Sequence, residues 1–109
     1  IRAVEYAKRA GAPVGHGSDL LGEMQRHQSR EFLLKSEAMT VHETLVSATK
    51  TNATILNRDG ELGVVAPGAL ADLVVVNGDP LQNLGLLQDQ GAYLPAIMKG
   101  GVFVKNELI

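Results

Sequence analysis

The stretch Val14-Gly15-His16-Gly17-Ser18-Asp19-Leu20-Leu21-Gly22 is the feature around which this chain is organised. An apolar approach leads through small residues to a single carboxylate, that of Asp19. Glycines let a ligand or another chain segment come close to the backbone. The pattern is typical of a strand that delivers a side chain to the mouth of a site. A Gly-Ser-Asp turn by itself is more often only a turn, so the surrounding elements must decide.

Composition limits the classes of function. The 109 residues are enough for one small domain, and a hydrophobic fraction of 45% is in the globular range. The net charge of -2, without a basic block, disfavours nucleic-acid binding. The absence of cysteine excludes disulfides and thiolate ligands and fits a reducing compartment, so we expect a cytoplasmic protein. No apolar run approaches the roughly 20 residues that span a bilayer, and we expect no membrane contact.

Helix and strand signals alternate in the first half of the chain. Residues 1–10 predict a helix that lacks a capping residue, so we expect the sequence to begin inside an element of a longer protein. Gly11 and Pro13 end this helix. Residues 12–17 predict a short buried strand, and the polar segment after Gly22 predicts a loop that runs into a helix beginning between Glu23 and Ser29.

The clearest helix signal is a capping box at Thr40 and Glu43. The helix that follows is expected to bury one face, which consists of Val41, Leu45, Ala48, Thr49, Asn52, Ala53 and Leu56. After Gly60 the pattern changes to turns and strands. We expect a turn at residues 66–69, a strand over 71–76, and a hairpin in which residues 96–99 and 102–105 flank Gly100-Gly101.

The residues alone point to no complete catalytic centre. The three histidines, His16, His27 and His42, match no zinc-binding spacing, so a metal site built from this chain alone is not expected. His16, Ser18 and Asp19 are too close in sequence to align as base, nucleophile and orienting acid. Asp19 could still supply one ligand to a metal site that is completed elsewhere.

The order of these motifs resembles a known family. Gly17-Ser18-Asp19 is followed by the capped helix, which contains Ala48-Thr49-x-x-Asn52-Ala53. Then come the segment G-x-x-x-P-G-x-x-A-D-L-V-V, from Gly63 to Val75, and the hairpin Met98-Lys99-Gly100-Gly101. Over nearly its whole length the chain resembles the C-terminal portion of the amidohydrolase superfamily. It is most similar to the imidazolonepropionase and Xaa-Pro dipeptidase (prolidase-like) branch.

The resemblance implies an α/β fold. Residues 1–59 would form the last βα units of a (β/α)8 TIM barrel, and residues 60–109 the C-terminal strands of an accessory β-sandwich. The family's His-x-His pair, its strand-four lysine or glutamate and its two later histidines have no counterpart in this sequence. The resemblance therefore implies a divalent metal site, of one or two zinc ions, with the remaining ligands outside this chain.

The resemblance also implies roles for individual residues. Asp19 matches the carboxylate that ends the eighth strand, contacts the metal, and passes a proton from the metal-bound water to the leaving amine. Ser18, where threonine is common, and His27, on the loop above Asp19, are candidate substrate-binding residues. His16 stands where an aromatic residue is common, so packing is expected of it. Asp72 is expected to be a buried structural carboxylate or a turn anchor.

Two hypotheses of different classes follow. In the first, the chain is the C-terminal part of a metal-dependent amidohydrolase that cleaves an amide bond in an Xaa-Pro dipeptide or an N-acyl amino acid. It would be inactive without the N-terminal part of the same protein. In the second, it is a non-catalytic binding or assembly module that forms homo-oligomers through exposed strand edges. Either one predicts unpaired edges and an uncovered apolar face. A remnant of proteolysis would look the same as the first.

Overall fold

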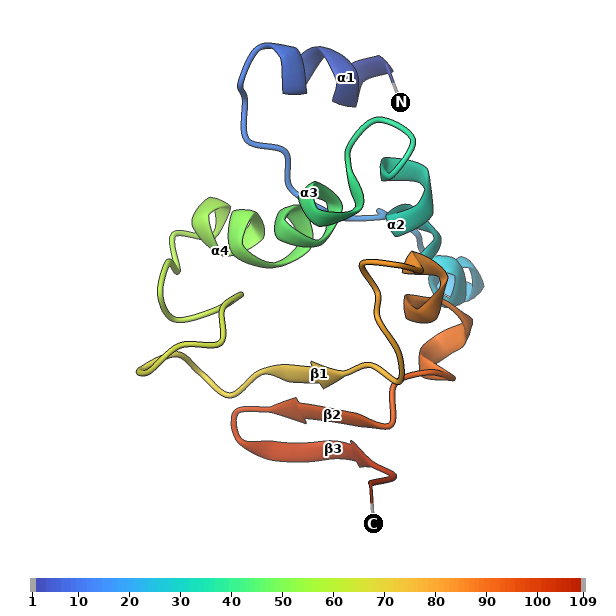
Figure 1. The fold of residues 1–109 in the computed structure, drawn as a ribbon, viewed down its shortest axis with the longest axis vertical. Helices are drawn as coiled ribbons and strands as arrows, with labels where there is room; N and C mark the ends of the chain where they lie inside the picture. The colour runs from blue at the N-terminus through green and yellow to red at the C-terminus, as the bar shows by residue number, and fades with distance from the viewer. Residues whose placement is uncertain (1, 109) are drawn as a thin grey trace.

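The computed structural model describes residues 2–108, in which a helical layer lies beside a three-stranded antiparallel sheet (Figure 1). The α-helices of this part are α1 (Arg2–Arg9), α2 (Arg30–Lys35), α3 (Val41–Val46) and α4 (Asn52–Ile55). The strands are β1 (Leu73–Val75), β2 (Ala96–Lys99) and β3 (Val102–Asn106). The 3-10 and π-helical segments are η1 (Gly22–His27), η2 (Ser47–Thr51), η3 (Leu84–Leu87) and η4 (Asp89–Gly91). Within the described residues, the α-helices precede residue 60 and the strands follow it.

The N-terminal helix is confirmed from Arg2, and Ile1 lies outside the described residues. The strand predicted over residues 12–17 is wrong, because this segment is extended without strand pairing. A strand needs a neighbouring strand to bond its backbone groups. Here the side chain of Asn52 does so instead: its Oδ1 accepts from the His16 N–H at 2.7 Å, and its Nδ2 donates to the His16 carbonyl at 3.0 Å.

The polar segment after Gly22 is more helical than the predicted loop. η1 is a 3-10 helix, and α2 begins at Arg30, just beyond the expected range. The ring of Phe32 on α2 lies over the His16 ring, with centroids 4.3 Å apart, which confirms the packing expected for His16. This contact joins α2 to the segment that precedes Asp19.

The capped helix is confirmed. Thr40 Oγ1 accepts from the Glu43 N–H at 3.1 Å, and Glu43 Oε1 accepts from the Thr40 N–H at 3.0 Å. Lys8 of α1 adds an ion pair to the same carboxylate at 2.9 Å. From this cap α3, η2 and α4 follow one another to Ile55, with the middle turn widened into a π-helix.

The predicted buried face of this helix is wrong in part. The side chains that it buries are Thr44, Ser47 and Ala53, whereas Leu56 is 65% exposed and Thr49 is also exposed. The π-helical turn departs from the 3.6-residue spacing on which the prediction rested, because its hydrogen bonds span five residues. The hydroxyls of Thr44 and Ser47 bond to backbone carbonyls of this helix, which makes their burial tolerable.

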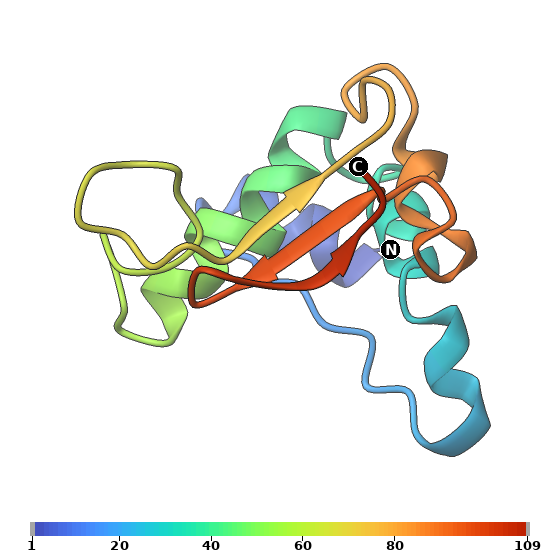
Figure 2. The same cartoon turned by 90° about the horizontal axis from the view of Figure 1, so that it is seen from below.

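The sheet agrees with the predicted strands and hairpin. β1 pairs with β2, and β2 with β3, both antiparallel, with a register shift between Ile97 and Met98. Gly100 and Gly101 form the turn with φ values of 57° and 84°, the backbone that tight hairpins require. Asp72 is exposed and not buried, but it is a turn anchor, because its Oδ1 accepts from the Gly100 N–H at 2.8 Å. Figure 2 shows the strands in front of the helices.

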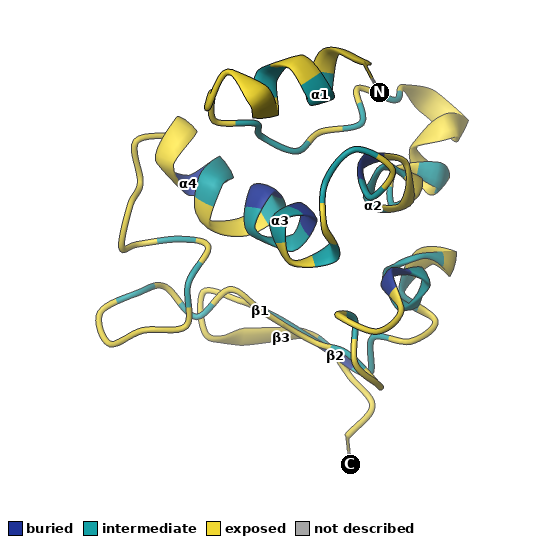
Figure 3. Cartoon of the chain, turned by 45° about the horizontal axis from the view of Figure 1, so that its top comes forward, coloured by how far each residue is buried: buried dark blue, intermediate teal, exposed yellow. Residues whose placement is uncertain are grey.

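The core is thin. The buried hydrophobic side chains among the described residues are those of Ala53, Leu84 and Ala96. Large apolar side chains on the sheet are open to solvent, including Val74 at 54% and Val104 at 65% (Figure 3). The radius of gyration, 14.4 Å, exceeds the value of about 13 Å typical of a compact domain of this length. The expectation of an uncovered apolar face is therefore confirmed.

Short helical segments join the two halves of the chain on one side. η3 packs against α2 and η4 against η1 (Figure 1). Lys105 of β3 donates to the Gly91 carbonyl at 2.8 Å, which ties the sheet to η4. The residues that follow Asp19 therefore lie against the turns that lead into β2. No helix within residues 2–108 has the length and apolarity needed to cross a bilayer.

Gly63 packs so closely against the capped helix that a side chain is excluded. Its φ is 76°, and a Cβ atom would lie 2.6 Å from the Thr49 carbonyl carbon. Gly60 has a similar φ, 79°, with nothing within 4 Å of a Cβ. Gly60→Ala should therefore destabilise by the backbone term alone, about 1–2 kcal/mol. Gly63→Ala should lose about 1–3 kcal/mol more from the steric clash.

Thermal unfolding of the two variants in the protein that carries this chain measures the difference. Equal melting temperatures for Gly60→Ala and Gly63→Ala would contradict the packing of residues 60–65 against η2.

Candidate active site

Asp19 lies on the surface with both carboxylate oxygens free. It is exposed and has no hydrogen bond or ion pair within the described residues. Its φ of 54° is in the left-handed region, which aspartate adopts more readily than most residues. This turn of the backbone ends the extended segment, and η1 begins three residues later at Gly22. A free carboxylate at such a corner is available to a metal ion or to a proton in transit.

Side chains of two helices hydrogen-bond to the backbone of the residues that precede Asp19. Besides the two bonds between Asn52 and His16, the Lys35 ammonium donates to the Gly15 carbonyl. A Cβ on Gly15 would lie 2.8 Å from both Asn52 Oδ1 and Ile55 Cδ1, so only glycine fits there. Sequence reasoning did not single out Lys35, and it named Asn52 only as part of the capped helix and of the family motif. Nothing in their local patterns marks a partner about 20 or more residues away.

Ser18 lies beside a pocket of about 330 Å³. The pocket is lined by His16, Gly17, Ser18, Gln28, Ser29, Phe32 and Ala48. Burial lowers the pKa of His16, and Lys35 lowers it further, while Glu31 opposes both. The buried Nδ1 of His16 has no hydrogen-bond partner. His16 is therefore a packed ring in the wall of this pocket, with its uncharged form favoured by burial.

His27 lies beside a second pocket, of about 280 Å³. Arg26, Arg30, Ser29 and the segment Gln88–Gln90 also line it. Asp89 is the one carboxylate in this lining, and neither arginine has an ion-pair partner within residues 2–108. Arg26 Nε donates to His27 Nε2 at 3.3 Å. Ser29 lines both pockets, so Ser18 and His27 border adjacent spaces, whereas Asp19 lines neither.

The described residues fit a metal ion only in part. Asp19 offers a free carboxylate oxygen, a ligand type that divalent metals accept. No group of three or more His, Cys, Asp or Glu side chains within residues 2–108 is placed to hold a metal. A catalytic zinc ion usually has three protein ligands. This part of the chain can therefore contribute one ligand and not a complete metal site.

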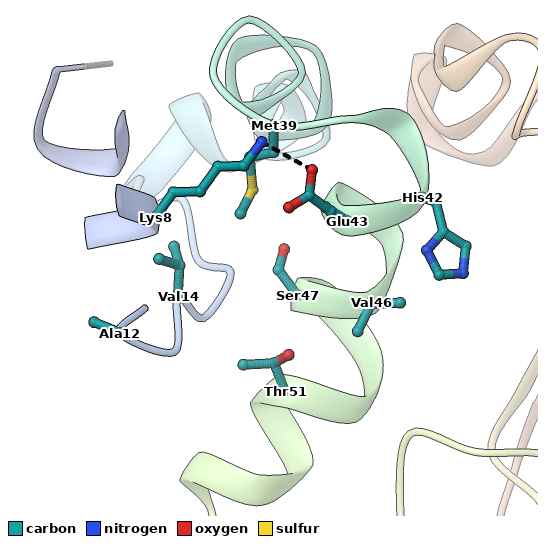
Figure 4. A pocket seen from close by; sticks show the side chains of 9 residues that line it. All are labelled: Lys8, Ala12, Val14, Met39, His42, Glu43, Val46, Ser47 and Thr51. Atoms are coloured by element: carbon teal, nitrogen blue, oxygen red, sulfur yellow. Dashed lines mark hydrogen bonds and ion pairs between the residues drawn. The ribbon is translucent and has the colours of Figure 1, made fainter. Parts of the chain in front are cut away.

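A third pocket, of about 320 Å³, lies away from these residues, between α1 and the capped helix (Figure 4). Its lining is mostly small or apolar, with the ion pair between Lys8 and Glu43 at its edge. Glu43 is already engaged by Thr40 and Lys8. His42 also lines this pocket, and Figure 4 shows Lys8 reaching across from α1.

Comparison with known proteins identifies the family. The model of the Amidohydrolase family matches residues 1–103. The chain belongs to the amidohydrolase family. No curated protein matches it significantly.

Solved structures similar to this chain include prolidase-like proteins. A prolidase crystallised with N-methylphosphonate-L-proline is 45% identical with a TM-score of 0.92, over 96% of this chain and 26% of that one. A putative prolidase from Bifidobacterium longum is 29% identical with a TM-score of 0.78, over 93% and 25%. A Xaa-Pro dipeptidase with bound methionine shares the fold, at 24% identity and a TM-score of 0.83, over 96% and 25%. The chain spans about a quarter of the length of these structures.

The pKa of Glu43 should respond to its two partners separately. The bond from the Thr40 backbone N–H, and then the bond from Lys8, lower it from the usual 4.5 to about 2. The charged cap is therefore fully stabilising above pH 4.5 and is lost as the pH falls through about 2. In Lys8→Met the pKa should rise but stay below 4.5, because the Thr40 bond remains. An NMR titration of the Glu43 carboxyl carbon measures this, and a normal pKa in Lys8→Met would contradict the capping box.

Proposed function

We propose that the chain supplies one part of the active site of a metal-dependent hydrolase, which cleaves the amide bond of an Xaa-Pro dipeptide or an N-acyl amino acid. The observation that carries this proposal is the 45% identity, over 96% of the chain, to the prolidase crystallised with N-methylphosphonate-L-proline. The free carboxylate of Asp19 supports it. The remainder of the site would come from the N-terminal part of the same protein, and this chain alone would be inactive.

Asp19 is the proposed acid/base and one metal ligand. Its unpaired carboxylate can accept a proton from an attacking water and return it to the leaving amine, a role in which the same group acts first as base and then as acid. A divalent metal such as zinc, when bound, supplies a water of lowered pKa. The left-handed backbone of Asp19 ends the held segment before it, and the residue is exposed.

Ser18 and His27 are the proposed substrate-binding residues, and Arg26 and Arg30 extend this role. Both proposed substrate classes carry a free carboxylate beside the scissile amide. The His27 pocket presents two arginines without ion-pair partners among the described residues, and guanidinium groups bind carboxylates through paired, charge-assisted hydrogen bonds. We assign this pocket to the substrate carboxylate and the Ser18 pocket to the neighbouring part of the substrate.

The proposed division of the chain places the end of a (β/α)8 barrel in residues 1–59 and strands of an accessory β-sandwich in residues 60–109. The positions of the α-helices and the strands on either side of residue 60 support it. Active sites on such barrels lie at the C-terminal ends of the strands. Asp19 and the pockets beside η1 would lie at that end.

A second candidate function is an assembly module that forms homo-oligomers. The exposed apolar side chains of the sheet, Val102 at 67% and Phe103 at 47% among them, favour it. The two candidates differ in what Asp19 does, because an assembly module needs no free carboxylate at that corner. Substitution of Asp19 therefore tests both candidate functions.

Asp19→Asn in the protein that carries this chain should lower kcat for Xaa-Pro hydrolysis by about 10²–10⁴-fold, because the amide cannot accept a proton. Asp72→Asn is the matched control. It should leave kcat unchanged, because an asparagine oxygen can still accept from the Gly100 N–H. Removal of metal with a chelator should abolish activity, and added zinc should restore it. Full activity in Asp19→Asn would overturn the proposal.

Arg26→Met and Arg30→Met test the carboxylate pocket. Each should raise KM for an Xaa-Pro dipeptide by about tenfold or more, because a charge-assisted bond is lost. The same variants should change KM little for the corresponding prolinamide, which lacks the negative charge. Lys99→Met, an exposed residue of the hairpin, is the control for general loss of positive charge. Equal effects on the dipeptide and on the amide would contradict the assignment.

A further inference from the structure

Lys35 is a buried lysine without a buried acid beside it. The residue is 4% exposed, at the end of α2. Its ammonium donates to the Gly15 carbonyl and lies 3.2 Å from Ser47 Oγ. That hydroxyl donates its own proton to the Thr44 carbonyl at 2.6 Å, which leaves its oxygen free to accept from Lys35. Within residues 2–108, no carboxylate lies within 4 Å of the Lys35 ammonium.

Stability alone does not account for a lysine at this position. Burial lowers the pKa of Lys35, and Glu31 only opposes that shift, so the charged form is disfavoured here. An apolar side chain of similar length would avoid this desolvation. What a lysine provides instead is a strong hydrogen-bond donor fixed on one backbone carbonyl.

The carbonyl that Lys35 contacts belongs to the segment that carries Asp19. Asn52 holds the next residue, His16, by both backbone groups, and a Cβ on Gly15 would collide with Asn52. The peptide between Gly15 and His16 is therefore held from α2 and from α4. Three residues later the chain reaches Asp19 and its left-handed corner. Few other contacts within the described residues fix the direction in which that carboxylate points.

We infer that Lys35 is a positioning residue for Asp19: its hydrogen bond to the Gly15 carbonyl fixes the backbone path that delivers the Asp19 carboxylate to the reaction. This inference rests on the proposed function, because it gives Asp19 a reaction to serve. Lys35 lies behind the segment and acts through the backbone of Gly15 and His16. Misplacement of a reacting group by about 1 Å can lower a rate by about 10²-fold.

The test compares Lys35→Met with Lys35→Arg in the protein that carries this chain. Lys35→Met removes the donor, and it should lower kcat by about 10- to 100-fold and leave KM within about twofold. Lys35→Arg keeps a donor and should recover most of kcat. Ser47→Ala is the matched control, because it removes the other partner of the ammonium and keeps the bond to Gly15. It should change the melting temperature more than kcat.

The outcomes separate the inference from the function on which it rests. Loss of hydrolysis in Asp19→Asn together with unchanged kcat in Lys35→Met would overturn the role of Lys35 and leave the proposed function standing. An absence of hydrolysis of both Xaa-Pro dipeptides and N-acyl amino acids by the wild-type protein would overturn the function itself. If kcat falls in proportion to the melting temperature in both Lys35→Met and Ser47→Ala, the role of Lys35 as a positioning residue is also overturned. If Lys35→Met does not fold, Lys35→Gln is judged by the same criteria.

Discussion

The two hydrogen bonds between the Asn52 side chain and the His16 backbone connect the chemistry of this chain to its fold. An amide side chain can donate and accept at once, so it replaces the neighbouring strand that an extended segment would otherwise need. With the bond from Lys35 to Gly15, it fastens the segment before Asp19 to the helices on either side. The placement of the proposed acid/base depends on these polar contacts more than on apolar packing.

Apolar packing contributes little to this part of the structure. Two of the three buried hydrophobic side chains among the described residues are alanines, and large side chains on β1 and β3 remain open to solvent. Burial of apolar area is usually the main favourable term in folding. Because little apolar area is buried here, specific hydrogen bonds, caps and turns contribute an unusual share of the local order. Examples are the cap at Thr40, the hydrogen bond between Asp72 and Gly100, and the hydrogen bonds between Asn52 and His16.

Tertiary contacts determined the part of the candidate site that the sequence pattern did not reveal. Asp19 was selected from its glycine-rich surroundings and from the order of the later motifs, and His27 and Ser18 from their places beside it. Arg26 and Arg30 are near His27 in the sequence, but the pocket that they share is completed by residues 88–90, where η4 packs against η1. Lys35 has the periodicity of an ordinary helical residue, and its role is visible only once Gly15 is next to it.

The sequence by itself determined the capped helix, the strand that follows the Pro-Gly turn, the glycine hairpin and the family to which the chain belongs. The three structural elements rest on residues close together in the chain: a cap within four residues, a glycine pair, or a run of β-branched side chains. The family rests on the order in which these motifs follow one another. Tertiary structure decided what the extended segment before Asp19 pairs with and which face of the capped helix is buried. Both depend on partners distant in sequence, and a hydrogen bond from residue 52 to residue 16 leaves no periodic trace in either segment.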